Sequence, residues 1–298
     1  SLGDFSNNTW GYKFGTSTNY TPIPALSTPA QILQTAGKTD GDETNSIKIG
    51  MKLGDNLESG RYTNKLVFSI LTNNYNHIAI MTEGPDFNTK LRALGAATDK
   101  IEHFKKSATA PAAIMNAVNV EAPESECEIK LWLDPSDKTA YYYTEPEKVY
   151  LNEDSSNMFN KYYALEGQYV IEGLGDIKDL DLSNFDTSKV TNMRYMFPDI
   201  YNLTTLDLSN FNTSNVTDMY GMFYLYNGAA SSDQLETIYV KNDFDTTKLT
   251  NYSYMFANRH KLRGGAGSHL ADPSTADKSW LRIDDPAHAR PGYFTRKP

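Results

Sequence analysis

The chain has 298 residues, and 28 Lys and Arg face 37 Asp and Glu, so its formal net charge is −9 at pH 7. No basic run offers the positive surface that nucleic-acid binding requires, and we expect no nucleic-acid partner. The single cysteine, Cys127, excludes a disulfide within the chain, so the protein is either cytosolic or secreted by cells that do not rely on disulfides.

Residues 1–73 carry strand patterns. Apolar and polar residues alternate over 10–14, 47–53 and 62–70, with Pro- and Ser-rich stretches between them. This predicts an antiparallel, immunoglobulin-like β-sandwich with one solvated face. Only about five strands are expected where such a sandwich has roughly seven, so we expect an incomplete module.

Residues 74–106 are predicted to form a helical connector. Leu91, Leu94, Ile101 and Phe104 fall near helical spacing, and Asp99 is placed to cap a short helix over 99–106.

Residues 107–298 begin with a predicted hairpin and continue into repeats. EIKLWLD and TAYYYTE flank the turn Pro135–Lys138. LDLSNFDTSKVTNMRYMF over 180–197 then recurs 26 residues later as LDLSNFNTSNVTDMYGMF over 206–223, and a diverged third copy covers 238–256. A fixed period of this size predicts stacked units that share one core, a solenoid.

Each repeat is predicted to contain a strand, a turn and a helical return. The spacing L-x-x-L-x-L-x-x-F from Leu203 to Phe211 is typical of a leucine-rich repeat. Thr213 and Ser214 are placed to cap the helical return. The Phe residues that end the strands should stack as an aromatic column. The predicted structural core is Leu182, Phe185, Met193, Phe197, Leu208, Phe211, Met219, Phe223, Phe244 and Phe256.

Polar residues beside the strand leucines should face outward and form a polar strip. We interpret the strip either as a solvated sheet face or as a ligand-binding surface. Its residues are Asp181, Ser183, Asn184, Asp207, Ser209, Asn210, Tyr239, Lys241 and Asn242. Tyrosines near the returns also suit contact surfaces, although part of them could pack between units: Tyr195, Tyr201, Tyr220, Tyr224, Tyr226 and Tyr254.

The two near-identical repeats resemble the BspA-like leucine-rich-repeat family of bacterial surface proteins. The segment RIDDPAHARPGYFT over 282–295 is similar to the end of that family's domains, so the resemblance covers about residues 100–298. NNTWGYKF and SGRYTNKLVFSI resemble β-sandwich modules of bacterial surface proteins. The resemblance implies export, display on the cell surface, adhesion and no enzyme chemistry.

The sequence suggests two functions and argues against a third. The first is a secreted, non-enzymatic adhesin that contacts a host or neighbouring-cell protein or glycan through the repeat face. The second is a subunit of a self-assembling surface filament or layer, in which the N-terminal sandwich accepts a strand from a neighbour. The third is a glycan hydrolase, but the sequence contains no catalytic motif that supports this function. We expect no catalytic residue, cofactor or metal, and a membrane link only through an anchor absent from this chain.

Overall fold

The structure is a computed structural model that describes residues 2–25, 46–55, 77–95, 100–160, 162–165, 168–171, 174, 176–226 and 233–298. Residue contacts divide the chain into two compact units, Ser1–Asn74 and Tyr75–Pro298. The described part is rich in β-structure, has few helices, and contains several small sheets of which none closes on itself.

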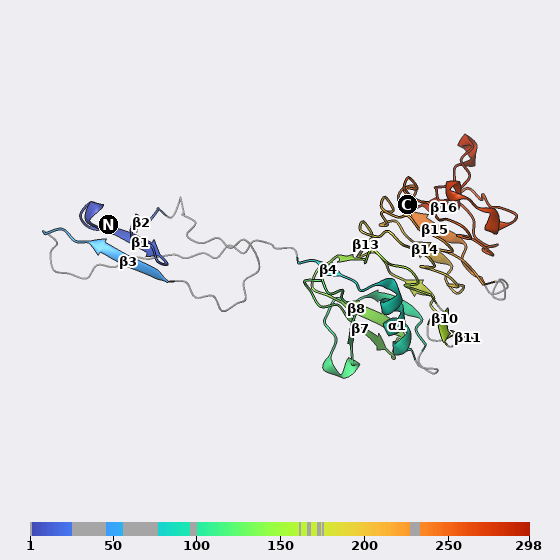
Figure 1. The fold of residues 1–298 in the computed structure, drawn as a ribbon, viewed down its shortest axis with the longest axis horizontal. Helices are drawn as coiled ribbons and strands as arrows, with labels where there is room; N and C mark the ends of the chain where they lie inside the picture. The colour runs from blue at the N-terminus through green and yellow to red at the C-terminus, as the bar shows by residue number, and fades with distance from the viewer. Residues whose placement is uncertain are drawn as a thin grey trace. The chain divides into compact units, whose positions relative to one another are not determined.

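The described residues of the first unit form a three-stranded antiparallel sheet in the order β2-β1-β3 (Figure 1). Its strands are β1 (Thr9–Phe14), β2 (Thr21–Pro22) and β3 (Ile47–Lys52), and a 3₁₀ helix precedes them, η1 (Leu2–Asp4). Strands were predicted at both 10–14 and 47–53, and both are confirmed. The strand predicted over 62–70 lies outside the described residues.

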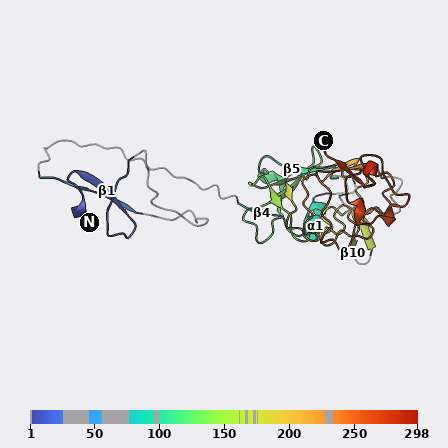
Figure 2. The same ribbon diagram turned by 90° about the horizontal axis from the view of Figure 1, so that it is seen from above.

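The second unit begins with a helix packed on a mixed sheet. The sheet runs β12-β5-β8-β7-β6. The helix α1 (Gly84–Leu94) lies against it (Figures 1 and 2). The Phe87 ring of the helix lies 5.9 Å from that of Phe104. The strands are β5 (His103–Lys106), β6 (Val118–Asn119), β7 (Lys130–Asp134), β8 (Thr139–Tyr143) and β12 (Asp179–Leu180). The predicted hairpin is confirmed as β7 and β8, which pair antiparallel.

The helix predicted over 99–106 is wrong. Residues 103–106 form β5, which pairs parallel with β12 on one side and β8 on the other. Phe104 is fully buried there and contacts the rings of Tyr142, Phe159 and Phe185. Pairing and packing with residues far along the chain therefore override the local helical spacing. The remaining helical signal of this segment lies in α1, whose Phe87 and Leu91 belong to the same core.

Short parallel strands follow in small sheets. One sheet has the order β13-β9-β4 and another the order β14-β15-β16, while β10 and β11 form a hairpin. In Figure 1, β14, β15 and β16 lie side by side. The strands are β4 (Ala79–Ile80), β9 (Val149–Tyr150), β10 (Tyr162–Leu165), β11 (Gln168–Ile171), β13 (Phe185–Asp186), β14 (Thr205–Asp207), β15 (Thr237–Val240) and β16 (Phe294–Arg296). Further 3₁₀ helices are η2 (Ala113–Met115), η4 (Pro273–Thr275), η5 (Lys278–Trp280) and η6 (Pro286–His288).

The return segments of the repeats are not helical, which corrects the predicted helical turns. Residues 213–225 contain turns. Alternate backbone N–H groups from Met219 to Leu225 donate to the next repeat, and others donate to carbonyls three residues back, not four. The Met193 N–H donates to the Asp218 carbonyl at 2.8 Å, and the Phe197 N–H donates to the Met222 carbonyl at 2.9 Å. The Phe223 N–H repeats the pattern one unit on, to the Met255 carbonyl. Neighbouring repeats therefore hold one another in a parallel register.

Aspartate and asparagine alternate along this stack and form a polar ladder, defined by Asp154, Asn192, Asp218 and Asn251. Each neighbouring pair forms a parallel β-bridge. The Asn192 amide donates to an Asp154 carboxylate oxygen at 3.0 Å, and the Asn251 amide donates to Asp218 at 2.9 Å. An amide between two carboxylates supplies donors and avoids placing like charges next to each other.

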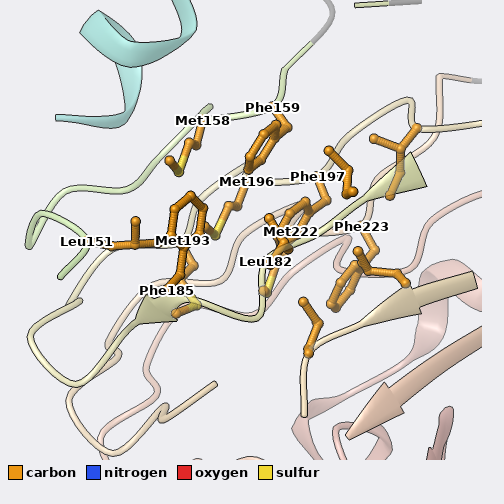
Figure 3. Close-up of a cluster of buried hydrophobic side chains, with 14 of the residues drawn as sticks. Leu151, Met158, Phe159, Leu182, Phe185, Met193, Met196, Phe197, Met222 and Phe223 are labelled. Carbon is orange, nitrogen blue, oxygen red and sulfur yellow. The ribbon is translucent and has the colours of Figure 1, made fainter. Parts of the chain in front are cut away.

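The core of the second unit is continuous, and nine of the ten predicted core residues are buried in it. The exception, Phe211, is only partly buried. The predicted aromatic column was placed on the wrong residues, since Phe185, Phe211 and Phe244 each contact other rings. The stacked rings are instead those of Phe159, Phe197, Phe223 and Phe256, with centroids 5.6, 6.2 and 5.2 Å apart. Figure 3 labels the first three of them.

The return segments explain where this column forms. The N–H of each phenylalanine donates to a methionine carbonyl of the next repeat: Phe159 to Met196, Phe197 to Met222 and Phe223 to Met255. These bonds keep successive rings at the same level. Phe185 pairs with Val149 of β9 instead of with the next repeat.

Candidate functional site

The polar strip lies beside the short parallel strands, and none of its nine residues is buried. Asp207 of β14 is in register with Tyr239 of β15, and Tyr239 is in register with Thr295 of β16. The parallel register thus brings strip residues of the second and third repeats together on one partly exposed face.

Several strip side chains form internal hydrogen bonds. An Asp181 carboxylate oxygen accepts hydrogen bonds from the Ser183 N–H at 3.0 Å and hydroxyl at 2.6 Å, and Asp207 accepts one from the Ser209 N–H at 3.0 Å. Such bonds fix the turn that follows each strand. The sequence pattern did not separate these turn-forming groups from groups able to bind a ligand.

Asn210 has a structural position within the strip. Its amide donates to the Leu182 carbonyl at 2.9 Å and to the Phe185 carbonyl at 2.6 Å, both in the preceding repeat. A side chain thereby ties the second repeat to the first at the place where each strand ends.

The C-terminal segment reaches the strip through Lys297. Its ammonium group pairs with the Asp207 carboxylate and lies 5.3 Å from the Tyr239 ring centroid. Burial opposes ionisation of Asp207, but the hydrogen bonds from Lys297 and Ser209 outweigh it and lower the Asp207 pKa. The same bond raises the pKa of Lys297. Sequence reasoning missed Lys297 because no local pattern links it to a residue 90 positions earlier.

A shallow polar cavity of about 370 Å³ lies at one end of the strip. It is lined by Asn242, Asp243, Ile283, Asp285, Arg290 and Arg296. Arg290 forms an ion pair with Asp243, so much of the local charge is neutralised. Of the lining residues, only Asn242 was among the predicted strip residues.

Exposed and half-buried residues of the return segments form an aromatic patch, defined by Arg194, Tyr195, Tyr220, Tyr224 and Tyr254. The Tyr195 ring meets those of Tyr220 and Tyr224 edge to face, at 5.3 and 5.9 Å, and Tyr220 meets Tyr254 at 5.6 Å. The patch therefore spans three consecutive repeats. The tyrosines were noted in the sequence, but Arg194 was not, because its position beside the rings depends on how the repeats stack.

Tyr195 is held firmly in the patch. Its ring covers Gly221 of the next repeat, where an added Cβ would lie 2.3 Å from the Tyr195 Cε1 atom. Burial, together with a hydrogen bond to Tyr220, raises the pKa of Tyr195 to about 12. The phenol therefore remains neutral at physiological pH.

No group of three or more His, Cys, Asp or Glu side chains able to hold a metal occurs among the described residues. Within that same part of the chain, no helix combines the length and apolar character needed to span a membrane.

Residues 153–272 match a family described as "Mycoplasma protein of unknown function, DUF285". The match covers less than half of the chain and includes all three repeats. Comparisons with curated proteins and with solved structures found no match.

Proposed function

We propose that residues 107–298 form a BspA-like leucine-rich-repeat solenoid, and that the chain is a non-enzymatic bacterial cell-surface protein that makes adhesive contacts. One observation carries the proposal: the parallel register of neighbouring repeats aligns equivalent, partly exposed polar residues into rows. Stacked-repeat proteins use such extended faces to bind partners. The family match covers all three repeats and supports their interpretation as copies of one structural unit, although that family's function is unknown.

The proposed partner is a protein or glycan on a host or neighbouring cell. The polar strip offers exposed side chains near its C-terminal end, where Lys241 and Asn242 are both exposed. The proposed location is outside the cell, and the resemblance to surface proteins supports it. The partial N-terminal sandwich is proposed to serve as a spacer that presents the repeats.

A binding assay tests the adhesive function. The immobilised chain is exposed to matrix proteins, to glycans and to whole cells, and saturable binding to at least one of them is expected. Lys241→Glu and Asn242→Ala should weaken binding at the strip without unfolding the protein, because both side chains are exposed. Absence of saturable binding to every surface would contradict the adhesive function.

The filament hypothesis remains a second proposal. It requires that the first unit accept a strand from a neighbouring copy, so mass should rise with protein concentration. Light scattering over a concentration series tests it, and a constant monomer mass would exclude it.

A further inference from the structure

The aromatic patch combines features of a protein-binding surface. Arg194 is exposed, and Tyr254 exposes 50% of its surface, while Tyr195, Tyr220 and Tyr224 are half-buried. Tyrosine and arginine are the residue types most enriched at the energetic centres of protein interfaces. A tyrosine supplies a large contact area and loses few rotatable bonds when it binds.

The patch is ordered before any partner arrives. Ring contacts connect its four tyrosines, and Gly221 leaves the space that the Tyr195 ring fills. The Arg194 guanidinium lies 4.3 Å from the Tyr220 ring centroid and 5.3 Å from that of Tyr195. Side chains already held in one arrangement lose less entropy on binding.

Two of the tyrosines occupy backbone positions that disfavour them. Tyr195 has φ 47° and Tyr254 has φ 58°, and the equivalent positions in other repeats are Asn157 and Gly221. Asparagine and glycine accept this left-handed conformation more easily than a bulky aromatic residue does. Tyrosine is therefore present where the backbone alone would favour a smaller residue, and such strain concentrates at functional positions.

Arg194 has an unused charge. Among the described residues, no carboxylate forms an ion pair with it, although the chain carries a net charge of −9. The rings beneath it hold the guanidinium by cation–π contact and leave its N–H groups able to bind a carboxylate with two parallel hydrogen bonds.

From this arrangement we infer that the aromatic patch binds a second protein, which presents one carboxylate to Arg194 and apolar side chains to the tyrosines. The inference rests on the proposed adhesive function and names the class of partner. One cation among four tyrosines does not suit an acidic polysaccharide, which needs a row of cations. A second copy of this chain is disfavoured because each copy carries the same negative charge.

The test pans a phage-displayed library of random short peptides against the full chain. Enriched peptides should contain Asp or Glu next to apolar residues. Arg194→Ala and Tyr254→Asn should each weaken their binding by about thirtyfold, the effect of losing an interface hot spot. Asn suits the backbone at position 254, as it does at Asn157. Lys189→Ala is the matched control. Lys189 belongs to the same repeat as Arg194 and also lies over a tyrosine ring, that of Tyr150, which is outside the patch.

Several outcomes would overturn the inference: no enrichment over an unrelated protein, equal losses in the control and the patch variants, or a dimer of the chain that Arg194→Ala separates. The cell-binding assay keeps the two proposals apart. If Arg194→Ala still binds cells, the aromatic patch is not the binding surface, but the adhesive function stands. If the chain binds peptides but no cells, the adhesive function is contradicted, but binding at the aromatic patch stands.

Discussion

Two phenylalanines of one repeat should differ in their contribution to stability. Phe223 is fully buried, and its ring lies between those of Phe197 and Phe256. Phe211, which follows β14 in the same repeat, is only partly buried and contacts Phe197 with tilted rings. Phe223→Ala and Phe211→Ala delete the same atoms, so they compare the two positions directly.

The expected difference follows from burial. Phe223→Ala removes a buried side chain and leaves a cavity in a stack, which should lower the free energy of unfolding by about 3–5 kcal/mol. Phe211→Ala loses about half of the usual burial gain of a large apolar side chain, or about 0.8–1.5 kcal/mol. With a urea dependence of about 3 kcal/mol per molar, the unfolding midpoints should fall by about 1–1.7 M for Phe223→Ala and about 0.3–0.5 M for Phe211→Ala.

The assay is urea unfolding followed by tryptophan fluorescence in a Trp10→Phe background. The two remaining tryptophans, Trp132 and Trp280, both lie in the second unit, so the signal reports that unit alone. Equal shifts, or a larger shift for Phe211→Ala, would refute the placement of the aromatic column in the return segments.

Three further predictions concern polar groups. Asn192→Asp places like charges side by side in the polar ladder and should cost about 1 kcal/mol, whereas Asn192→Ser, measured by the same urea titration, should cost less. Hydrogen bonds from two lysines lower the Glu102 pKa from 4.5 to about 2, so its contribution is complete above pH 4.5 and disappears as pH falls toward about 2. Thermal unfolding of Glu102→Gln should therefore converge with that of the wild type in acid, and a gap that persists there would contradict the assignment. Asp233→Ala leaves the fully buried Arg259 guanidinium without its carboxylate and should cost about 3–5 kcal/mol, while the double variant with Arg259→Met should regain most of this loss in calorimetry.

The sequence predicted the features that depend on pattern alone. Strand alternation located β1, β3, β7 and β8, and nine of the ten core residues named from the repeat spacing are buried. It failed where contacts distant in sequence decide the outcome. Met193, Met196 and Phe197 have helix-like spacing, yet bonds to the next repeat hold their segment in an extended, turning path.

The candidate site shows the same limit. Alternation correctly indicated that the strip residues are not buried, but it did not show which of them hold turns together. Arg194 could not be recognised at all, because its ring partner Tyr220 belongs to the following repeat. A local pattern carries no information on which neighbour a side chain will meet after stacking.

The alternation of the polar ladder has a consequence for how the array can change in length. Removing the unit that contains Asp218 would place Asn192 against Asn251, whereas removing that unit together with a neighbour would preserve the order of acid and amide. Duplications and deletions of repeats should therefore be tolerated best in even numbers.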